Sequence, residues 1–192
     1  MSALLRAYSS ALRRFPTTVQ SIQAGSLMAV GDMTSQMLIE RRSLQQYEWQ
    51  RSARFFTLGT VLVGPALRVW YGVLDRKFGS LGRAAALKKV FFDQAFFAPS
   101  FLVVFLGSLG LMQGKTANEV QKQIKKDYID IVIAGWMVWP AVQVCNFSFV
   151  PLHHQVLVVQ TFALFWNTYL AWKINREDNV TENETQSQQP ER

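Results

Sequence analysis

The sequence has almost none of the residues that build disulfides, thiol chemistry or metal centres. Its only cysteine is Cys145, so no intramolecular disulfide can form and nothing in the chain requires an oxidising compartment. We interpret Cys145, in the middle of an apolar run, as a small buried packing residue. The only histidines, His153 and His154, are adjacent and point about 100° apart on a helix, which does not suit a shared metal ion. The sequence therefore predicts no metal site and no cofactor.

Catalytic motifs are lacking too. There is no nucleophile elbow and no His-Glu-x-x-His motif. Residues 110–116 read Gly-Leu-Met-Gln-Gly-Lys-Thr and look like a phosphate-binding loop, but that loop needs four residues before Gly-Lys-Thr and only three are present. We interpret this segment as the end of a span followed by a turn and a helix N-cap at Thr116. We predict that the protein is not an enzyme.

Charged side chains are scarce. They make up 17% of the 192 residues, against roughly 25% in an ordinary soluble domain. Hydrophobic residues make up 49%, and they gather in runs of about 20 residues, long enough to cross a bilayer as helices. Four runs occupy residues 19–39, 55–74, 90–112 and 131–150, and a shorter fifth covers 156–172. The mean hydropathy is only +0.07, which leaves a soluble helical bundle as the alternative.

We therefore predict an all-α fold, a polytopic membrane bundle of four to five transmembrane helices over residues 17–174. An amphipathic basic segment (1–16) precedes it and a disordered polar tail (175–192) follows it. Proline removes a backbone donor and disturbs the preceding turn, so we expect kinks at Pro65, Pro99 and Pro140.

The net charge of +7 would fit nucleic-acid binding, but its location argues against that function. Residues 1–16 carry three arginines and no acid, and residues 75–89 carry five basic residues and one acid. Both segments flank predicted spans, where Lys and Arg meet anionic headgroups. We expect membrane lipids as partners and no direct contact with nucleic acid. The Arg-rich, acid-poor N-terminus is typical of mitochondrial entry signals, and a helix lying on the membrane explains it equally well.

The first predicted span carries a face of small residues. Ser21, Gly25 and Ala29 recur at four-residue spacing, which allows close helix contact. This face either packs helices within the chain or joins subunits of a homo-oligomer or a larger membrane complex.

Three charged residues lie inside or at the edge of the predicted spans: Asp32, Arg68 and Asp93. Ionised groups at such depth usually face the interior of a bundle or a watery path. Arg68 paired with one aspartate would make a structural clamp between helices. Alternatively, the charges would line a pore. The amides that would line it with them are Gln36, Gln94, Gln143 and Asn146.

Several blocks resemble the Mpv-seventeen and twenty-two-kilodalton peroxisomal membrane protein family. They are Gly31-Asp32 with Gln36, Arg51 and Arg54 with Gly59, Gly64-Pro65 with Trp70-Tyr71, Asp93-Gln94 with Pro99, Trp136-x-x-Trp139-Pro140-x-x-Gln143-x-x-Asn146-Phe147-x-x-Val150-Pro151, and Trp166-Asn167-x-Tyr169-Leu170. The chain departs from the family at Gln155, where an arginine is common, and Arg68 is not a family feature.

The resemblance implies an integral protein of the mitochondrial inner membrane with channel-like activity. It also implies a role in metabolite and membrane-potential homeostasis and in mitochondrial DNA maintenance. Within such a channel we expect Asp32 to carry the cation preference, since it lies deepest in its span. The alternatives are a scaffold that conducts nothing, and a member of the peroxisomal branch.

Overall fold

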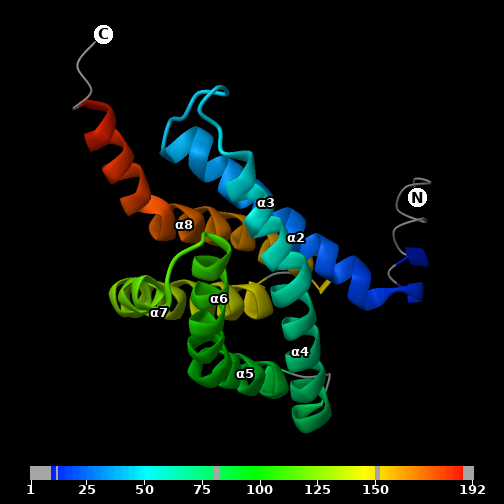
Figure 1. Cartoon of the computed structure of the whole chain (residues 1–192). Helices are drawn as coiled ribbons and strands as arrows, with labels where there is room; N and C mark the ends of the chain where they lie inside the picture. Colours follow the sequence, from blue (N-terminus) through cyan, green and yellow to red (C-terminus); the bar gives the residue numbers. More distant parts are fainter. Residues whose placement is uncertain (1–9, 12, 80–82, 150–151, 188–192) are drawn as a thin grey trace.

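The computed structural model describes residues 10–11, 13–79, 83–149 and 152–187. Every regular element within these ranges is helical, which confirms the predicted all-α class (Figure 1). The elements are α2 (Pro16–Thr34), the π-helical turn η1 (Ser35–Ile39), α3 (Trp49–Leu58), η2 (Gly59–Val63), α4 (Gly64–Phe78), α5 (Arg83–Phe92), η3 (Asp93–Phe97), α6 (Ala98–Met112), α7 (Ala117–Phe149) and α8 (Leu152–Ser187).

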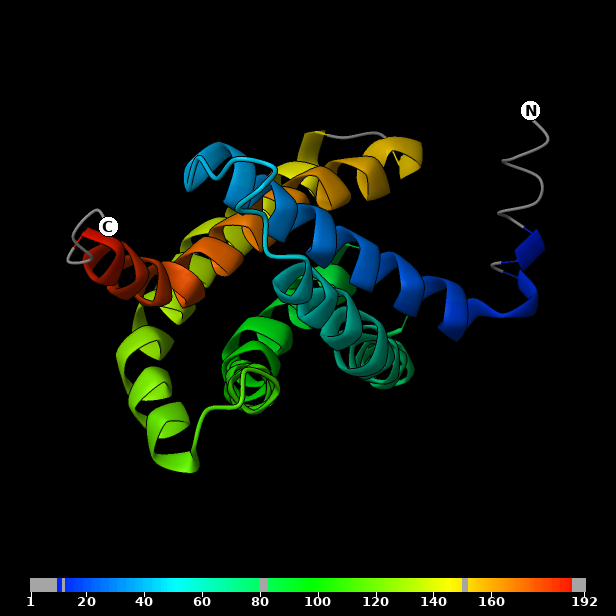
Figure 2. The ribbon, with the colours of Figure 1, turned by 45° about the horizontal axis from the view of Figure 1, so that its top comes forward.

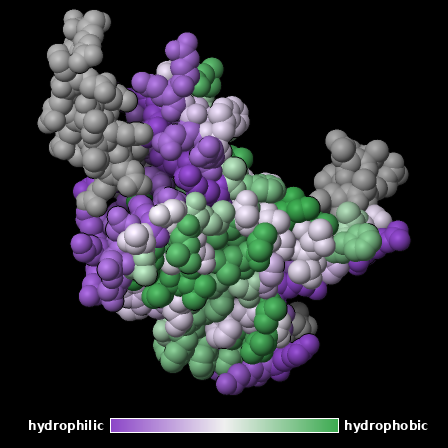
Figure 3. Space-filling model, in the orientation of Figure 1, coloured by the Kyte–Doolittle hydropathy of each residue, from purple (hydrophilic) through white to green (hydrophobic). Residues whose placement is uncertain are grey.

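Three continuous helices in the described chain are long and apolar enough to cross a membrane: Trp49–Phe78, Ala84–Met112 and Ala117–Cys145. They contain three of the predicted spans, those at 55–74, 90–112 and most of 131–150. Over the described residues, the runs at 19–39 and 156–172 do not reach the same length and hydropathy as these three. Figure 3 shows apolar residues in a band across one face, with hydrophilic residues above and below it, as a bilayer requires.

Two of the predicted kinks take the form of π-turns. Pro65 lies at the start of α4 directly after η2, and Pro99 lies at the start of α6 directly after η3. A proline ring clashes with the carbonyl four residues earlier and offers it no N–H. Those carbonyls belong to Val61 and Ala95, in the middle of the two π-turns, where wider spacing accommodates the missing bond. Pro140 differs, because α7 continues through it as an α-helix.

Helix α2 is the central element, in contact with α3, η2, α4 and α8 (Figure 2). Its small residues bring backbones together. A methyl group on Gly59 would lie 2.5 Å from Cα of Gly25, and one on Gly64 would lie 2.5 Å from Cα of Ser21. Two of the three residues of the predicted small face therefore pack against η2 and α4 of the same chain. The third, Ala29, is half-buried.

On its opposite side, α2 crosses α8 at Gly31, where an added methyl group would lie 2.6 Å from Cβ of Asn167. The apolar core lies next to this crossing and draws on α2, α3, α6, α7 and α8. Its members include Met28, Phe55, Leu58, Leu102, Phe105, Leu106, Leu109, Ile131, Leu170 and Ile174.

Helix α7 begins at a reciprocal capping box. The backbone N–H of Thr116 donates to Oε2 of Glu119 at 2.7 Å, and the backbone N–H of Glu119 donates to Oγ1 of Thr116 at 3.4 Å. This arrangement confirms the N-cap predicted at Thr116. Farther along the same helix the structure corrects one prediction: Cys145 is exposed and not buried.

The end of α8 also differs from the sequence prediction, which placed a disordered tail from residue 175. The helix runs to Ser187. Asn175 is 3% exposed and accepts a hydrogen bond from Gln113, while Gln123 donates to the carbonyl of Ile174. These contacts fix the chain at the predicted boundary, and the Glu and Gln residues that follow are good helix formers. Residues 188–192 lie outside the described part of the chain.

Candidate functional site: a polar clamp and a central cavity

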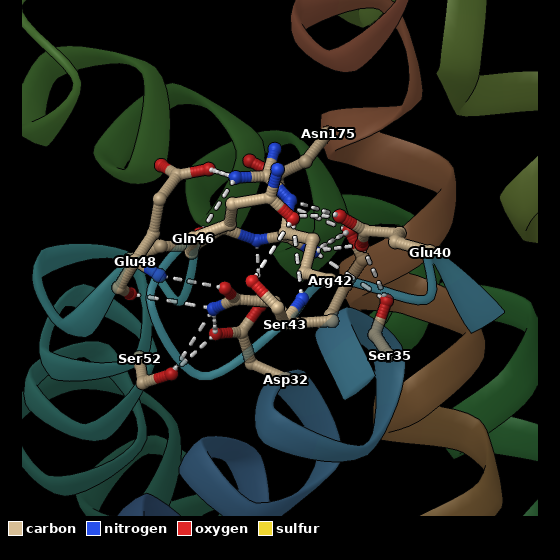
Figure 4. A network of polar contacts seen from close by, with 12 residues as sticks. Asp32, Ser35, Glu40, Arg42, Ser43, Gln46, Glu48, Ser52 and Asn175 are labelled. Atoms are coloured by element: carbon tan, nitrogen blue, oxygen red, sulfur yellow. Dashed lines mark hydrogen bonds and ion pairs between the residues drawn. The ribbon is translucent and has the colours of Figure 1, made fainter. Parts of the chain in front are cut away.

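A buried polar cluster joins the end of α2, the turn η1, the start of α3 and helix α8. We call it the polar clamp, and its members are Asp32, Ser35, Gln36, Glu40, Glu48, Arg51 and Ser52. Asp32 and Gln36 have no exposed surface and Arg51 is 2% exposed. Figure 4 shows members of the clamp converging from separate elements, with Asp32, Ser35, Glu40, Glu48 and Ser52 labelled. Burial of so many polar groups is tolerated only where they satisfy one another.

Asp32 is neutralised inside the chain. Nε of Arg51 lies 2.7 Å from its Oδ1, as an ion pair. The hydroxyl of Ser52 donates to Oδ2 at 2.6 Å, and Nε2 of Gln36 donates to the same oxygen at 2.8 Å. Asp32 therefore has one cation and two hydrogen-bond donors, all within the protein.

Arg51 also binds a second carboxylate. Its Nη1 and Nη2 donate to the two oxygens of Glu40 at 2.8 and 2.6 Å, a bidentate pair. Nη2 further reaches the carbonyl of Ala171 at 3.4 Å, which ties α8 to the cluster. Ser35 donates to Glu40 at 2.8 Å and completes this side of the clamp. One guanidinium thus fastens α2, η1 and α8 to the start of α3.

Gln36 joins the clamp to the connector before α3. Its Oε1 accepts from the backbone N–H of Glu48 at 2.9 Å, and its Nε2 lies 3.3 Å from the carbonyl of the same residue. Tyr47 shares a hydrogen bond of 2.6 Å with Ser52. The polar stretch after α2 is therefore folded back onto the cluster.

The sequence anticipated a clamp but assigned it the wrong arginine. Among the described residues, Arg68 forms no ion pair with Asp32 or Asp93, and its Nη1 donates to Gln20 at 3.3 Å. The physical reason is the chain direction. Helices α2 and α3 run antiparallel, so Asp32, near the end of α2, meets Arg51 at the beginning of α3, while Arg68 lies beside the beginning of α2.

Arg51 belongs to one of the blocks that resemble the family, but neither Arg51 nor Ser52 was predicted as a site residue, because both fall in a polar stretch just before the predicted span. Their spacing in the sequence nevertheless indicates that they face the core. Residues 48, 51, 52 and 55 fall on one helical face, and Phe55 is in the core, so the core-facing side of α3 extends back into the charged segment.

A second feature is a central cavity of about 1350 Å³ between α2, α4, η3, α6, α7 and α8. Four of the residues predicted to line a pore do line this cavity: Arg68, Asp93, Gln94 and Gln143. Asp32 and Gln36 do not, because they lie in the clamp. Asn146 lies in α7, and the position of its side chain is outside the described part of the structure.

Asp93 is held on the cavity wall by neutral donors. Nε1 of Trp70 donates to its Oδ1 at 2.9 Å, and Nε2 of Gln94 donates to its Oδ2 at 3.1 Å. Trp70 stacks on Phe97 with ring centroids 4.9 Å apart, and Trp136 donates to the carbonyl of Gln94 at 2.8 Å. Unlike Asp32, this carboxylate has no ion pair with any described residue.

The clamp and the cavity are separated by apolar side chains. Met28, Leu102, Phe105, Ile131 and Leu170 line the cavity and also belong to the apolar core. Asp32 lies one helical turn beyond Met28 along α2. The cavity therefore ends at an apolar layer, with the clamp behind it.

Comparison with known proteins supports the family resemblance. Residues 110–171 match the model of the Mpv17 / PMP22 family. The mitochondrial inner membrane protein Mpv17 of Mus musculus is 47% identical over 174 residues, which cover 91% of this chain and 99% of that protein. The protein of the same name from Danio rerio is 45% identical over 176 residues, 92% and 99% of the two chains. Protein SYM1 of Gibberella zeae is 38% identical over 174 residues, 90% and 98% of the two chains.

No solved structure matches the chain. The relatives are matched over almost their whole length, so the likeness covers the clamp and the cavity as well as the α7 segment. The chain belongs to the Mpv17 / PMP22 family, and it is a multi-pass protein of the mitochondrial inner membrane.

Proposed function

We propose that this protein is a non-enzymatic channel, and that the central cavity is part of its conducting path. The observation that carries the proposal is the lining of the cavity. A space of about 1350 Å³ inside a membrane bundle is bordered by two arginines, two aspartates and several amides. Charged and amide side chains within a span are costly unless water or a solute reaches them, and Arg68, Asp93 and Gln143 lie within the three long apolar helices.

The path proposed here differs from the one expected from the sequence. Asp32 is saturated by Arg51, Ser52 and Gln36, so it offers a passing ion neither free charge nor a free oxygen. The candidate for the charge that selects ions is instead Asp93, on the cavity wall. Its two oxygens accept one hydrogen bond each, from Trp70 and Gln94, and both donors are neutral.

This conformation represents a closed state of the proposed channel. The apolar layer of Met28, Leu102, Phe105, Ile131 and Leu170 blocks the clamp end of the cavity. Conduction requires these side chains to separate, and an apolar constriction of this kind gates by excluding water.

The family resemblance supports a physiological role. In that role the channel would contribute to metabolite and membrane-potential homeostasis and thereby to mitochondrial DNA maintenance, without itself binding nucleic acid. The large cavity suits a path for small solutes better than a narrow filter for one dehydrated ion.

The test is single-channel current from purified protein in planar bilayers, with glycine variants that fill the cavity. Gly72 lines the cavity, and a methyl group there would meet no atom within 4 Å. Gly107 has equally open surroundings but does not line the cavity. Gly72→Phe should reduce the conductance, whereas the matched control Gly107→Phe should leave it unchanged.

The competing function is a scaffold that conducts nothing, and the clamp is the observation that favours it. Arg51 explains the presence of Asp32 without any ion path. However, Ser21 and Gly25, which would have joined subunits, already pack against α4 and η2 of the same chain. Folded protein that gives no current over a range of voltages would favour the scaffold. Equal currents from both glycine variants would instead place the conducting path outside the cavity.

A further inference from the structure

Two arginines on one side of α4 border the cavity. Arg68 and Arg76 are eight residues apart, which places them on one helical side. No described residue forms an ion pair with either of them, and Arg68 donates to the neutral amide of Gln20 at 3.3 Å. In contrast, the cations Arg51, Lys89 and Lys173 are each paired with a carboxylate.

The charges around this part of the cavity do not cancel. Arg68 and Arg76 contribute two positive charges, and Asp75 and Asp93 contribute two negative ones. Asp75 is already paired with Lys89, which adds a third cation and gives a net charge of +1. A ligand carrying one negative charge would complement this site.

Most of the remaining cavity wall is apolar. Gln20, which holds Arg68, is eight residues from Met28 along α2, a distance of about 12 Å at 1.5 Å per residue. The wall over this length includes Leu27, Phe101, Leu102 and Phe105. The volume of about 1350 Å³ exceeds the roughly 300–1,000 Å³ of a typical small-molecule pocket. Space of this size, with a wall that is mostly apolar, can accommodate hydrocarbon chains.

The cavity also reaches the outer surface of the bundle. Val69 and Val73 line it, yet they are 68% and 47% exposed. Both are apolar and lie within Trp49–Phe78, which is long and apolar enough to span the membrane. A lipid therefore has a sideways entrance along α4, between the cavity and the bilayer.

We propose that the cavity is a binding site for an anionic phospholipid. The phosphate lies against the guanidinium of Arg68, beside its contact with Gln20. Arg76 is close to the headgroup, and the acyl chains extend along α2 and α6 toward Met28 and Phe105. Arginine is suited to this role because its planar fork donates two parallel hydrogen bonds to phosphate oxygens. The inference goes beyond conduction, because the site holds lipid whether or not the protein is a channel.

The experiment is native mass spectrometry of the full-length protein in detergent, incubated with palmitoyl-oleoyl-phosphatidylglycerol. A parallel sample receives the diacylglycerol with the same chains, which lacks the phosphate, and a third receives inorganic phosphate as competitor. We expect one phosphatidylglycerol to be retained per chain, little diacylglycerol, and no displacement by inorganic phosphate.

The variants separate headgroup from chain recognition. Arg68→Gln should weaken retention about tenfold, as loss of one charged hydrogen bond does. Lys77→Gln is the matched control, because Lys77 follows Arg76 on the same helix but faces the rings of Phe78 and Phe92. Gly72→Phe should exclude the lipid, and Gly107→Phe should not.

Three results would overturn the lipid site: no retained lipid, equal retention of diacylglycerol, or equal retention by the two glycine variants. Displacement by inorganic phosphate would indicate a simple anion site instead. Because the readout is mass and not current, this test is independent of whether the channel proposal holds.

Discussion

Arg51 and Asp32 form a buried ion pair, with Nε of the arginine 2.7 Å from Oδ1 of the aspartate. The two residues lie at the adjoining ends of antiparallel helices, and the same guanidinium binds Glu40 through its other two nitrogens. Arg51 thus pairs with two carboxylates, one from α2 and one from the connector that follows η1, and Arg42 of the same connector also pairs with Glu40. This geometry makes Arg51 the residue on which the polar clamp depends.

Replacing Arg51 with methionine should destabilise the protein strongly. The change leaves Asp32 buried without a counter-ion, while Glu40 keeps its ion pair with Arg42. Removal of one partner from a buried ion pair costs about 3–5 kcal/mol. Thermal unfolding of the purified protein in detergent measures the effect. Arg41→Met is the control, because Arg41 is exposed in the same polar connector. Equal melting temperatures for the two variants would contradict the assigned role of Arg51.

Lysine at position 51 should restore only part of the lost stability. The guanidinium reaches Asp32 with Nε and Glu40 with Nη1 and Nη2, whereas a lysine has one nitrogen and cannot hold both carboxylates in this geometry. We expect the melting temperature of Arg51→Lys to lie between those of the wild type and Arg51→Met. A fully stable lysine variant would mean that charge alone, and not the planar fork, holds the clamp together.

Replacing individual glycines with alanine should change the stability of the protein in opposite directions, depending on the space around each glycine. In Gly59→Ala the new methyl group would lie 2.5 Å from Cα of Gly25, a backbone atom that cannot move aside. Such overpacking costs about 1–3 kcal/mol. Gly72→Ala and Gly107→Ala meet open space, so each should be neutral or stabilise its helix by up to about 1 kcal/mol. Unfolding measurements on all three variants check the sign of each change in the free energy of unfolding. A Gly59→Ala protein as stable as the wild type would contradict the close approach of α2 and η2.

The sequence predicted the helical class, three of the spans and four residues of the cavity, because these depend on the length and periodicity of apolar runs. The partner of Asp32 could not be found this way. That pairing depends on how far α3 extends beyond its apolar part, and Arg51 looks like an ordinary basic flank when read along the chain. The charge of Arg51 suggests a side chain exposed to solvent, but helix α8 covers it in the structure.

The prolines illustrate the same limit. Local chemistry predicts a disturbance near Pro65 and Pro99, and a π-turn precedes each of them. It gives no reason for the different outcome at Pro140, which lies inside α7 without a π-turn. Whether a helix bends or widens depends on the packing around the freed carbonyl, which is a property of the assembled bundle.

The two aspartates should behave differently if the cavity conducts ions. Asp32 is neutralised by Arg51 and lies behind the apolar layer, so Asp32→Asn should lower the melting temperature and leave the ion preference of surviving channels unchanged. Asp93 lines the cavity and is held only by Trp70 and Gln94, so Asp93→Asn should reduce the preference for cations while the fold remains intact. Reversal potentials under a salt gradient across a planar bilayer measure the preference. The reverse pattern, with selectivity lost in Asp32→Asn and kept in Asp93→Asn, would place the conducting path at the clamp. Such a path would have to break the Arg51 ion pair each time it opens, so the open probability should then rise in Arg51→Lys as well.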